Sequence, residues 1–268
     1  MSDNTMTKEE ILRKAIIKKG GNIKLGNMGS WMVLFGNVDW YIPELNRTCK
    51  GTCGNCTGCF NEKNPRKSEC YVAKSYIQHV NRNADGSKGD IVKNKCTVKL
   101  GHAYRTIAIT EMREELQKSL DKQLTRTKFE IVRLNESGEL TCYADFKMWC
   151  ELAEAHKETV FYIYTKNYDA IREAIDWGII PENMFVNISV WHENGIKEYL
   201  EMAWHPQIRA FIVVDEEWTV AKYLSNGIHI TTMCGAYDRK GKLNHELSCK
   251  KCKKCFSHNN KCCGCFEH

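Results

Sequence analysis

Short runs of apolar and β-branched residues recur along the chain at lengths that are typical of β-strands. We predict six strands, at residues 31–35, 129–134, 160–165, 184–190, 210–214 and 229–233. Segments with apolar positions on one helical face separate the later strands, at residues 144–156, 169–177, 196–203 and 218–224. Strands that alternate with helices of about ten residues indicate βα units and a parallel sheet.

The pattern is less regular elsewhere in the chain. We expect a helix at residues 72–80, an exposed loop at 83–94 and an amphipathic helix at 111–124. From Asp238 onward no regular structure is expected. The sequence therefore predicts two domains, a βα domain at residues 1–235 and a cysteine-rich extension at residues 236–268.

Length and composition fit one sizeable α/β domain with a small appendage. The 268 residues are 43% hydrophobic and 27% charged, which is ordinary globular usage and excludes a collagen-like or wholly disordered chain. No run approaches the roughly 18 consecutive apolar residues of a membrane span. The opening MSDNTMTKEE also lacks the basic start and apolar run of a secretory signal. We expect a cytoplasmic protein without a membrane partner.

Cysteine content is the feature that departs from ordinary usage. With 15 cysteines and no export signal, metal ligation or catalysis is favoured over a disulfide framework. Most of the cysteines gather in two groups, at residues 49–70 and 249–265. The formal net charge of +6 counts every thiol as neutral, so it carries little weight as an indication of nucleic-acid binding.

Polar residues follow the predicted strands at their carboxyl ends, where parallel βα folds form their active sites. After the first strand comes the first cysteine group, and the later strands are followed in turn by Ser137, Gly138, Glu139, Thr165, Asn167, Ser189, His192, Asp215 and Cys234. Because parallel strands end at one edge of a sheet, we expect these side chains on one face.

The first cysteine group has the spacing C-x3-C-x2-C-x2-C, from Cys49 through Cys53 and Cys56 to Cys59. Glycines between these cysteines let a short loop curl, so that several thiolates can converge. Thiolates suit an iron–sulfur cluster or zinc, and zinc prefers two C-x2-C pairs separated by a dozen or more residues. The loop therefore favours an iron–sulfur cluster.

CKGTCGNC at residues 49–56 resembles the C-x3-C-x2-C motif of the radical S-adenosylmethionine (SAM) superfamily. The resemblance implies an α/β fold, a partial (β/α)6 barrel, in which Cys49, Cys53 and Cys56 hold a 4Fe-4S cluster whose fourth iron chelates SAM. The residue before the third cysteine is commonly aromatic in that superfamily, whereas here it is Asn55.

The same resemblance implies which other residues contact SAM. A glycine-rich motif after the second strand binds the SAM amino group in that superfamily, and residues 137–139 occupy its position here. The implied SAM contacts are Ser137, Gly138, Glu139, Thr165, Asn167 and Ser189.

Most of the chain resembles the phage "gene product eighty-eight" family, which is often regarded as radical-SAM-like. The matching pieces are TCKG, CYVAKSY, VRLNESGEL, FYIYTKN and CKKCKKCF, at residues 48–51, 70–76, 132–140, 161–167 and 249–256. The last loop cysteine of that family corresponds to Cys70. Cys59 and Cys70 are therefore alternatives to one or two of the first three ligands.

The second cysteine group resembles the auxiliary-cluster extensions of radical SAM enzymes. Cys234, Cys249, Cys252 and Cys255 have the spacing C-x14-C-x2-C-x2-C. A cluster with four thiolate ligands is coordinatively closed, which suits electron transfer or a structural role. A structural zinc site is the alternative. Three cysteines are surplus to this set, namely Cys262, Cys263 and Cys265.

These expectations combine into an oxygen-sensitive radical SAM enzyme that cleaves SAM reductively to a 5'-deoxyadenosyl radical. The radical abstracts hydrogen from an unidentified substrate, which could be a nucleic acid or a peptide. The cluster requires a reductant protein such as flavodoxin or ferredoxin. Two alternatives stay open: a zinc- or iron–sulfur-stabilised protein that binds nucleic acid through its basic cysteine-rich tail, and an iron–sulfur redox protein without SAM chemistry.

Overall fold

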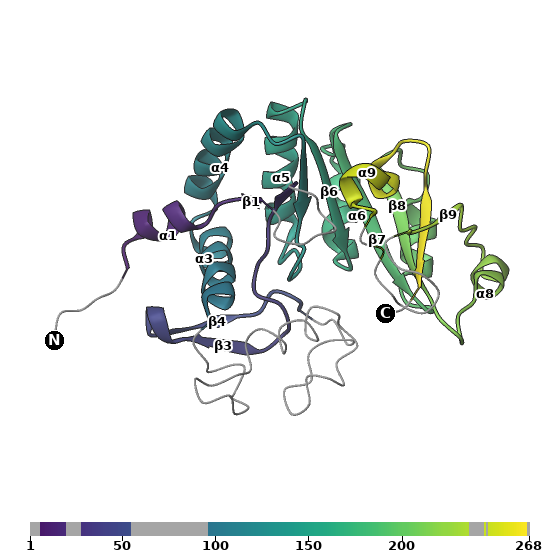
Figure 1. The fold of residues 1–268 in the computed structure, drawn as a ribbon, viewed down its shortest axis with the longest axis horizontal. Helices are drawn as coiled ribbons and strands as arrows, with labels where there is room; N and C mark the ends of the chain where they lie inside the picture. Colours follow the sequence, from purple (N-terminus) through teal and green to yellow (C-terminus); the bar gives the residue numbers. More distant parts are fainter. Residues whose placement is uncertain (1–5, 20–27, 55–95, 236–243, 245, 267–268) are drawn as a thin grey trace. The chain divides into compact units, whose positions relative to one another are not determined.

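The computed structural model describes residues 6–19, 28–54, 96–235, 244 and 246–266 (Figure 1). The chain forms two compact units, each assembled from separate segments. Unit 1 comprises residues 1–16, 32–123 and 135–141, and unit 2 comprises residues 17–31, 124–134 and 142–268. This division differs from the predicted boundary at residue 235. The predicted helix at 72–80 and the loop at 83–94 lie outside the described residues.

Unit 1 contains helices packed with a two-stranded antiparallel hairpin. Helix α1 (Lys8–Lys14) begins with a capping box in which Thr7 and Glu10 exchange hydrogen bonds, and it packs against α3 (Thr97–Glu111). Strands β3 (Asp39–Ile42) and β4 (Arg47–Lys50) pair with each other and are connected by the 3₁₀ turn η2 (Pro43–Leu45). Trp40 of β3 is fully buried and is paired with Cys49 of β4.

Helix α4 (Arg113–Thr127) follows α3 and confirms the predicted amphipathic helix at 111–124. Helix α3 itself was not predicted from the sequence. Lys99 and Arg105 are almost completely buried in it, so its apolar face cannot be recognised from residue type alone.

Unit 2 is built on an eight-stranded sheet with the order β1-β2-β5-β6-β7-β8-β10-β9. Its strands are β1 (Lys18–Lys19), β2 (Gly29–Ser30), β5 (Ile131–Leu134), β6 (Val160–Thr165), β7 (Met184–Trp191), β8 (Ile208–Val214), β9 (Thr232–Met233) and β10 (Cys262–Phe266). Every neighbouring pair is parallel except β1 with β2. The α/β class and the parallel sheet are therefore confirmed. In the described residues the sheet ends at β1 and β9, without closure into a barrel.

Four helices connect the strands of unit 2 close to the predicted positions. They are α5 (Tyr143–Ala155), α6 (Tyr168–Asp176), α7 (Ile196–Met202) and α8 (Val220–Ser225). Helix α5 buries Phe146, Trp149, Cys150 and Ala153, which repeat at the i, i+3, i+4, i+7 spacing of one helical face. The rings of Trp31 and Trp149 meet edge to face with centroids 5.2 Å apart. None of the described helices is long and apolar enough to span a membrane.

Two predictions about strands were wrong. The strand that pairs in parallel with β5 is β2 (Gly29–Ser30) and not residues 31–35, because the chain leaves the sheet after Trp31, whose N–H still donates to Arg133 O (2.9 Å). The expectation that regular structure ends at Asp238 was also wrong, since β10 lies between β8 and β9. The cysteines of its sequence CCGCF were left surplus to the predicted ligand set, yet buried cysteine also packs as a small hydrophobic residue in a strand.

The segment that carries the second cysteine group packs onto the sheet of unit 2. It contains α9 (Cys249–Cys252) and the 3₁₀ turn η4 (Lys254–Phe256), which contacts β6 and β7. Phe256 joins a hydrophobic cluster with Met28, Ile131, Tyr162 and Phe185. This apolar contact fixes the position of the adjacent cysteines on the sheet, in the part of the chain that begins with α9 in Figure 1.

Candidate functional site

In unit 1 the loop that carries Cys53 is held tightly to the segment before β3. Cys53 N–H donates to Gly36 O (2.9 Å), and Gly36 N–H donates back to Cys53 Sγ (3.0 Å). Gly51 lies so close to this segment that a Cβ atom there would collide with the carbonyl oxygens of Phe35 and Gly36. A glycine is therefore required at position 51 for the loop to close.

Thr52 joins this loop to the predicted SAM-binding segment at residues 137–139, which also belongs to unit 1. Its hydroxyl donates to Leu34 O (2.8 Å) and accepts from Glu139 N–H (2.8 Å). Gly138 adopts a φ of 79°, and a Cβ there would lie 2.6 Å from Thr52 Oγ1. Two segments that are far apart in sequence are thus brought into direct contact.

Ser137 and Glu139 both make hydrogen bonds within unit 1. Ser137 Oγ donates to Val33 O (3.1 Å), and Glu139 Oε1 accepts from Leu140 N–H (2.8 Å). Ser137 is buried, whereas Glu139 is half-buried. The carboxylate of Glu139 is therefore the better placed of the two to meet a charged ligand.

The two described thiols of the first group differ in environment. Cys49 is 5% exposed on β4, and burial raises the pKa of its thiol although the charge of Arg47 opposes this shift. Cys53 is half-buried. Cys56, Cys59 and Cys70 lie outside the described residues. Within the described part of the chain, no three cysteine, histidine or carboxylate groups converge closely enough to hold a metal ion.

The predicted SAM contacts at β6 and β7 belong to unit 2. Thr165 Oγ1 accepts from Asn167 N–H (2.9 Å), and Asn167 Oδ1 accepts from Ala170 N–H (3.2 Å) and so caps α6. Ser189 is half-buried on β7. Asn187, two residues earlier on the same face, is fully buried, and its Oδ1 has no hydrogen-bond donor among the described residues.

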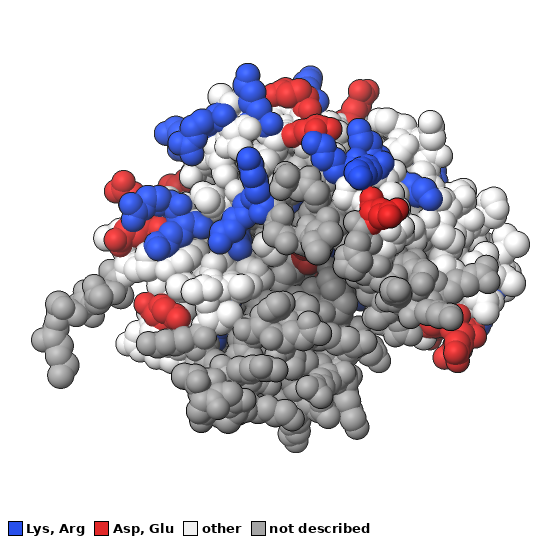
Figure 2. Space-filling view, viewed as in Figure 1, with Lys and Arg blue, Asp and Glu red and all other residues white. Residues whose placement is uncertain are grey.

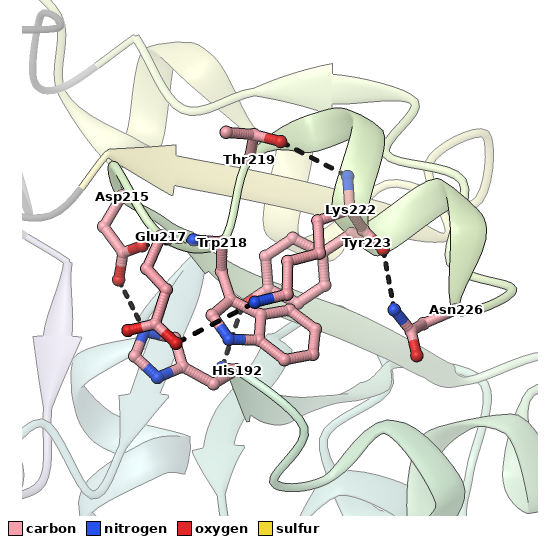
Figure 3. A network of polar contacts seen from close by, with 8 residues as sticks. All are labelled: His192, Asp215, Glu217, Trp218, Thr219, Lys222, Tyr223 and Asn226. Carbon is pink, nitrogen blue, oxygen red and sulfur yellow. Dashed lines mark hydrogen bonds and ion pairs between the residues drawn. The ribbon is translucent and has the colours of Figure 1, made fainter.

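A histidine–carboxylate pair lies at the carboxyl ends of β7 and β8 (Figure 3). His192 Nε2 donates to Asp215 Oδ2 (2.6 Å), and the indole of Trp218 stacks on the imidazole with centroids 5.7 Å apart. His192 N–H donates to Tyr223 OH (2.9 Å), which in turn donates to Val213 O (2.7 Å). A carboxylate bonded to Nε2 orients the ring, so that Nδ1 can exchange a proton with a ligand.

His192 is held in a backbone conformation that is unfavourable for a residue with a side chain. Its φ is 54°, and the left-handed region costs roughly 1–2 kcal/mol for such residues. The bonds to Asp215 and Tyr223 offset this cost. The sequence indicated His192 and Asp215 separately as strand-end residues, but it gave no signal that they pair with each other.

Replacing Asp215 by asparagine should lower the free energy of unfolding by about 1–3 kcal/mol at neutral pH, since a charge-assisted hydrogen bond is lost. Burial alone would raise the pKa of Asp215, but hydrogen bonds from His192 and Trp218 N–H outweigh it, and the pKa is lowered. This stabilisation is present above the unfolded-state pKa of about 3.9 and is lost as pH falls through the lower native pKa.

Urea unfolding of the wild type and Asp215→Asn between pH 7 and pH 3 measures this effect. The difference between the two proteins should shrink toward the acid end. Asp169→Asn is the matched control, because that carboxylate is 97% exposed beside Arg172. If the difference in the free energy of unfolding between Asp215→Asn and the wild type does not change with pH, the stabilisation does not come from the ionised Asp215 carboxylate.

The second cysteine group is partly assembled in unit 2. Cys234 lies near Cys252 and Cys255, and both Cys249 and Cys255 pack against the hydrophobic cluster around Tyr162. Cys255 accepts a hydrogen bond from Cys263, which lowers the pKa of the Cys255 thiol against the opposing effect of burial. The same bond, together with burial, raises the pKa of Cys263.

The lysines of this segment form ion pairs and hydrogen bonds within unit 2. Lys250 Nζ lies 2.6 Å from a carboxylate oxygen of Glu130, and Lys253 Nζ lies 4.0 Å from the other. Lys254 Nζ donates to Met233 O (3.0 Å). Acidic side chains also lie among the basic ones on the face seen in Figure 2. Nucleic acid would have to compete with these contacts for the basic tail.

The fold and the cysteine groups define an α/β protein with a parallel sheet, one thiol-bearing loop in unit 1 and a second thiol-rich segment on the sheet of unit 2. The chain belongs to the Gene product 88 family, whose model matches residues 6–265. This match confirms the resemblance to that phage family. No curated protein and no solved structure matches the chain.

Proposed function

We propose that this protein is an iron–sulfur enzyme of the radical SAM type. The observation that carries the proposal is the contact of Thr52, which joins the cysteine loop to Glu139 through a 2.8 Å hydrogen bond. In the superfamily that the sequence resembles, the corresponding two segments hold the cluster and the SAM amino group. Their contact here supports a shared site for both groups.

The residues of unit 1 fit such a site chemically. The N–H of Gly36 donates to Cys53 Sγ (3.0 Å), and a hydrogen bond of this kind stabilises a thiolate and tunes the reduction potential of a cluster. Cys49 is buried, so its thiolate would require a metal to offset the cost of burial. The half-buried carboxylate of Glu139 suits an ammonium group.

Cys49, Cys53 and Cys56 are the proposed ligands, with Cys59 and Cys70 as the alternatives. In unit 1 the proposed SAM contacts are Ser137, Gly138 and Glu139. A cluster held by these cysteines would supply one electron, drawn from a flavodoxin- or ferredoxin-like reductant, for the reductive cleavage of SAM to methionine and a 5'-deoxyadenosyl radical, which would take hydrogen from the substrate. The chain itself orients SAM and shields the radical from water.

The second cysteine group is proposed to hold an auxiliary iron–sulfur cluster or zinc. Its ligands in this proposal include the four cysteines indicated by spacing, Cys234, Cys249, Cys252 and Cys255. Phe256 packs this segment against the sheet of unit 2 and so fixes its position there. Such a closed site would serve structure or electron transfer.

Iron, acid-labile sulfide and zinc in protein purified without oxygen test the proposal. We expect at least about four iron with matching sulfide per chain, and 5'-deoxyadenosine after addition of SAM and dithionite. Iron and sulfide without SAM cleavage would favour the redox protein. Zinc with negligible sulfide would refute the radical mechanism and favour the nucleic-acid-binding alternative.

A further inference from the structure

His192 and Asp215 directly follow β7 and β8, two neighbouring parallel strands of unit 2. Both oxygens of Asp215 accept hydrogen bonds, Oδ2 from His192 Nε2 (2.6 Å) and Oδ1 from Trp218 N–H (2.6 Å). The side chain of Asp215 is only 13% exposed. The carboxylate is therefore fixed by its own loop, and it holds the imidazole in the tautomer that carries the proton on Nε2.

The imidazole of His192 is also held by the aromatic rings beside it. The indole of Trp218 lies nearly parallel to the imidazole, at an interplanar angle of 11°, and the ring of Trp191 meets it edge-on with centroids 6.2 Å apart. The side chain of His192 remains 28% exposed, and Figure 3 shows Nδ1 turned away from Asp215. In this tautomer Nδ1 carries a lone pair, so it can accept a hydrogen bond from a ligand.

The backbone of His192 indicates that an imidazole is needed at this position. Its φ of 54° lies in the left-handed region, which glycine and asparagine adopt at lower cost. Tyr223 OH accepts from His192 N–H (2.9 Å) and maintains this conformation. A purely structural link between the two loops needs only a donor to Asp215, which an asparagine amide also supplies. The strain at His192 therefore points to a role for Nδ1, since strained residues gather at functional sites.

The charged side chains in the loops around His192 are mostly acidic. They are Glu193, Asp215, Glu216, Glu217, Lys166 and Lys222. Glu193 and Glu216 are exposed and form no ion pair within the described part of the chain, whereas Glu217 lies 3.8 Å from Lys222 Nζ. Four carboxylates beside two ammonium groups leave a negative potential, which favours a cationic ligand over an anionic one.

We propose that the carboxyl ends of β7 and β8 form a binding site for a primary amine in its ammonium form. His192 Nδ1 accepts a hydrogen bond from the ammonium group, and Asp215 is a positioning residue that keeps Nδ1 unprotonated. The acidic loops supply the charge that complements the ligand. This inference goes beyond the proposed function and uses neither cysteine group, so it is independent of SAM chemistry.

A titration of the wild-type full chain, followed by NMR of the histidine rings, tests the site with three probes. Butane-1,4-diamine should shift the ring resonances of His192 saturably at neutral pH and constant ionic strength, and succinate should not shift them. The third probe is the diamine with both nitrogens fully methylated, which keeps the charge but has no N–H to donate. It should bind at least about tenfold more weakly than the diamine, because a hydrogen bond that involves a charged group is lost. The exposed His229 is the internal control and should not respond.

Asp215→Asn tests the role of the carboxylate. An asparagine amide can donate to Nε2 and so allows the tautomer with the proton on Nδ1, which repels an ammonium group. The diamine should bind about tenfold more weakly to this variant, and two-bond ¹H–¹⁵N correlations should show the proton on Nε2 in the wild type. Asp169→Asn, at a carboxylate that is 97% exposed, is the matched control and should bind as the wild type does.

Glu193→Gln keeps the tautomer and removes one charge from the loop. It should weaken diamine binding by about two- to fivefold, the effect expected of an exposed charge. The comparison of the three probes on the wild type requires no variant, so it decides the proposal even where Asp215→Asn folds poorly. The proposal would be overturned by the absence of a saturable shift at up to about 10 mM diamine, by equal binding of the methylated probe, or by a proton on Nδ1 in the wild type.

Discussion

Cys53→Ala is expected to remove the iron and acid-labile sulfide of the first cysteine group and to abolish SAM cleavage. Cys53 carries the thiol that accepts the Gly36 N–H, and a methyl group can neither ligate iron nor accept that bond. The second site should keep its metal, because its cysteines belong to unit 2. Total iron should therefore fall by about four per chain if both sites hold 4Fe-4S clusters, or to near zero if the second site holds zinc.

Cys142→Ala is the control for this variant. Cys142 is an exposed cysteine at the start of α5, and it belongs to neither cysteine group. Its replacement should leave iron, sulfide and SAM cleavage unchanged. Wild-type iron content in Cys53→Ala would show that other cysteines of the loop hold the cluster.

Gly51→Ala is expected to destabilise unit 1 by about 2–4 kcal/mol and to lower the iron content of the first site. The added Cβ would collide with the carbonyl oxygens of Phe35 and Gly36, and backbone atoms cannot rotate away as a side chain can. The loop must then move away from this segment, which breaks the bonds that hold Cys53 in place.

Gly54→Ala separates this collision from a general effect of losing a glycine. Gly54 has a φ of 53°, but an added Cβ would meet nothing within 4 Å. Gly54→Ala should lower the free energy of unfolding by only about 1 kcal/mol, since left-handed strain is partly offset by the reduced conformational freedom of the unfolded chain. Urea unfolding combined with iron analysis compares the two variants. If Gly51→Ala and Gly54→Ala lose similar amounts of stability and iron, close backbone approach at Gly51 is not what the loop requires.

The alternation of strands and helices in unit 2 could be predicted because each element has its own hydrophobic pattern in the sequence. Strands β6, β7 and β8 consist mostly of apolar, β-branched and aromatic residues, and α5 repeats its buried positions at helical spacing. Strand β10 carried no such signal. Its cysteines have two physical roles, as metal ligands and as small packed side chains, and residue type alone does not distinguish them.

The candidate sites were predictable as chemical groups but not as contacts. Spacing identified the cysteines, and strand ends identified residues 137–139. The link through Thr52 depends on folding of segments that are 87 positions apart, and local pattern carries no information about it. The same applies to the pair of His192 and Asp215, which are separated by 23 positions.

The order of the sheet constrains how the protein is made. Strand β9 is synthesised before β10 but pairs in the described sheet only with β10, which also occupies the edge of β8. Until residue 266 has left the ribosome, β8 presents an open edge that could pair with another chain. Translational pausing or premature termination before this point would therefore leave a nascent chain prone to aggregation, even though most of its core had already formed.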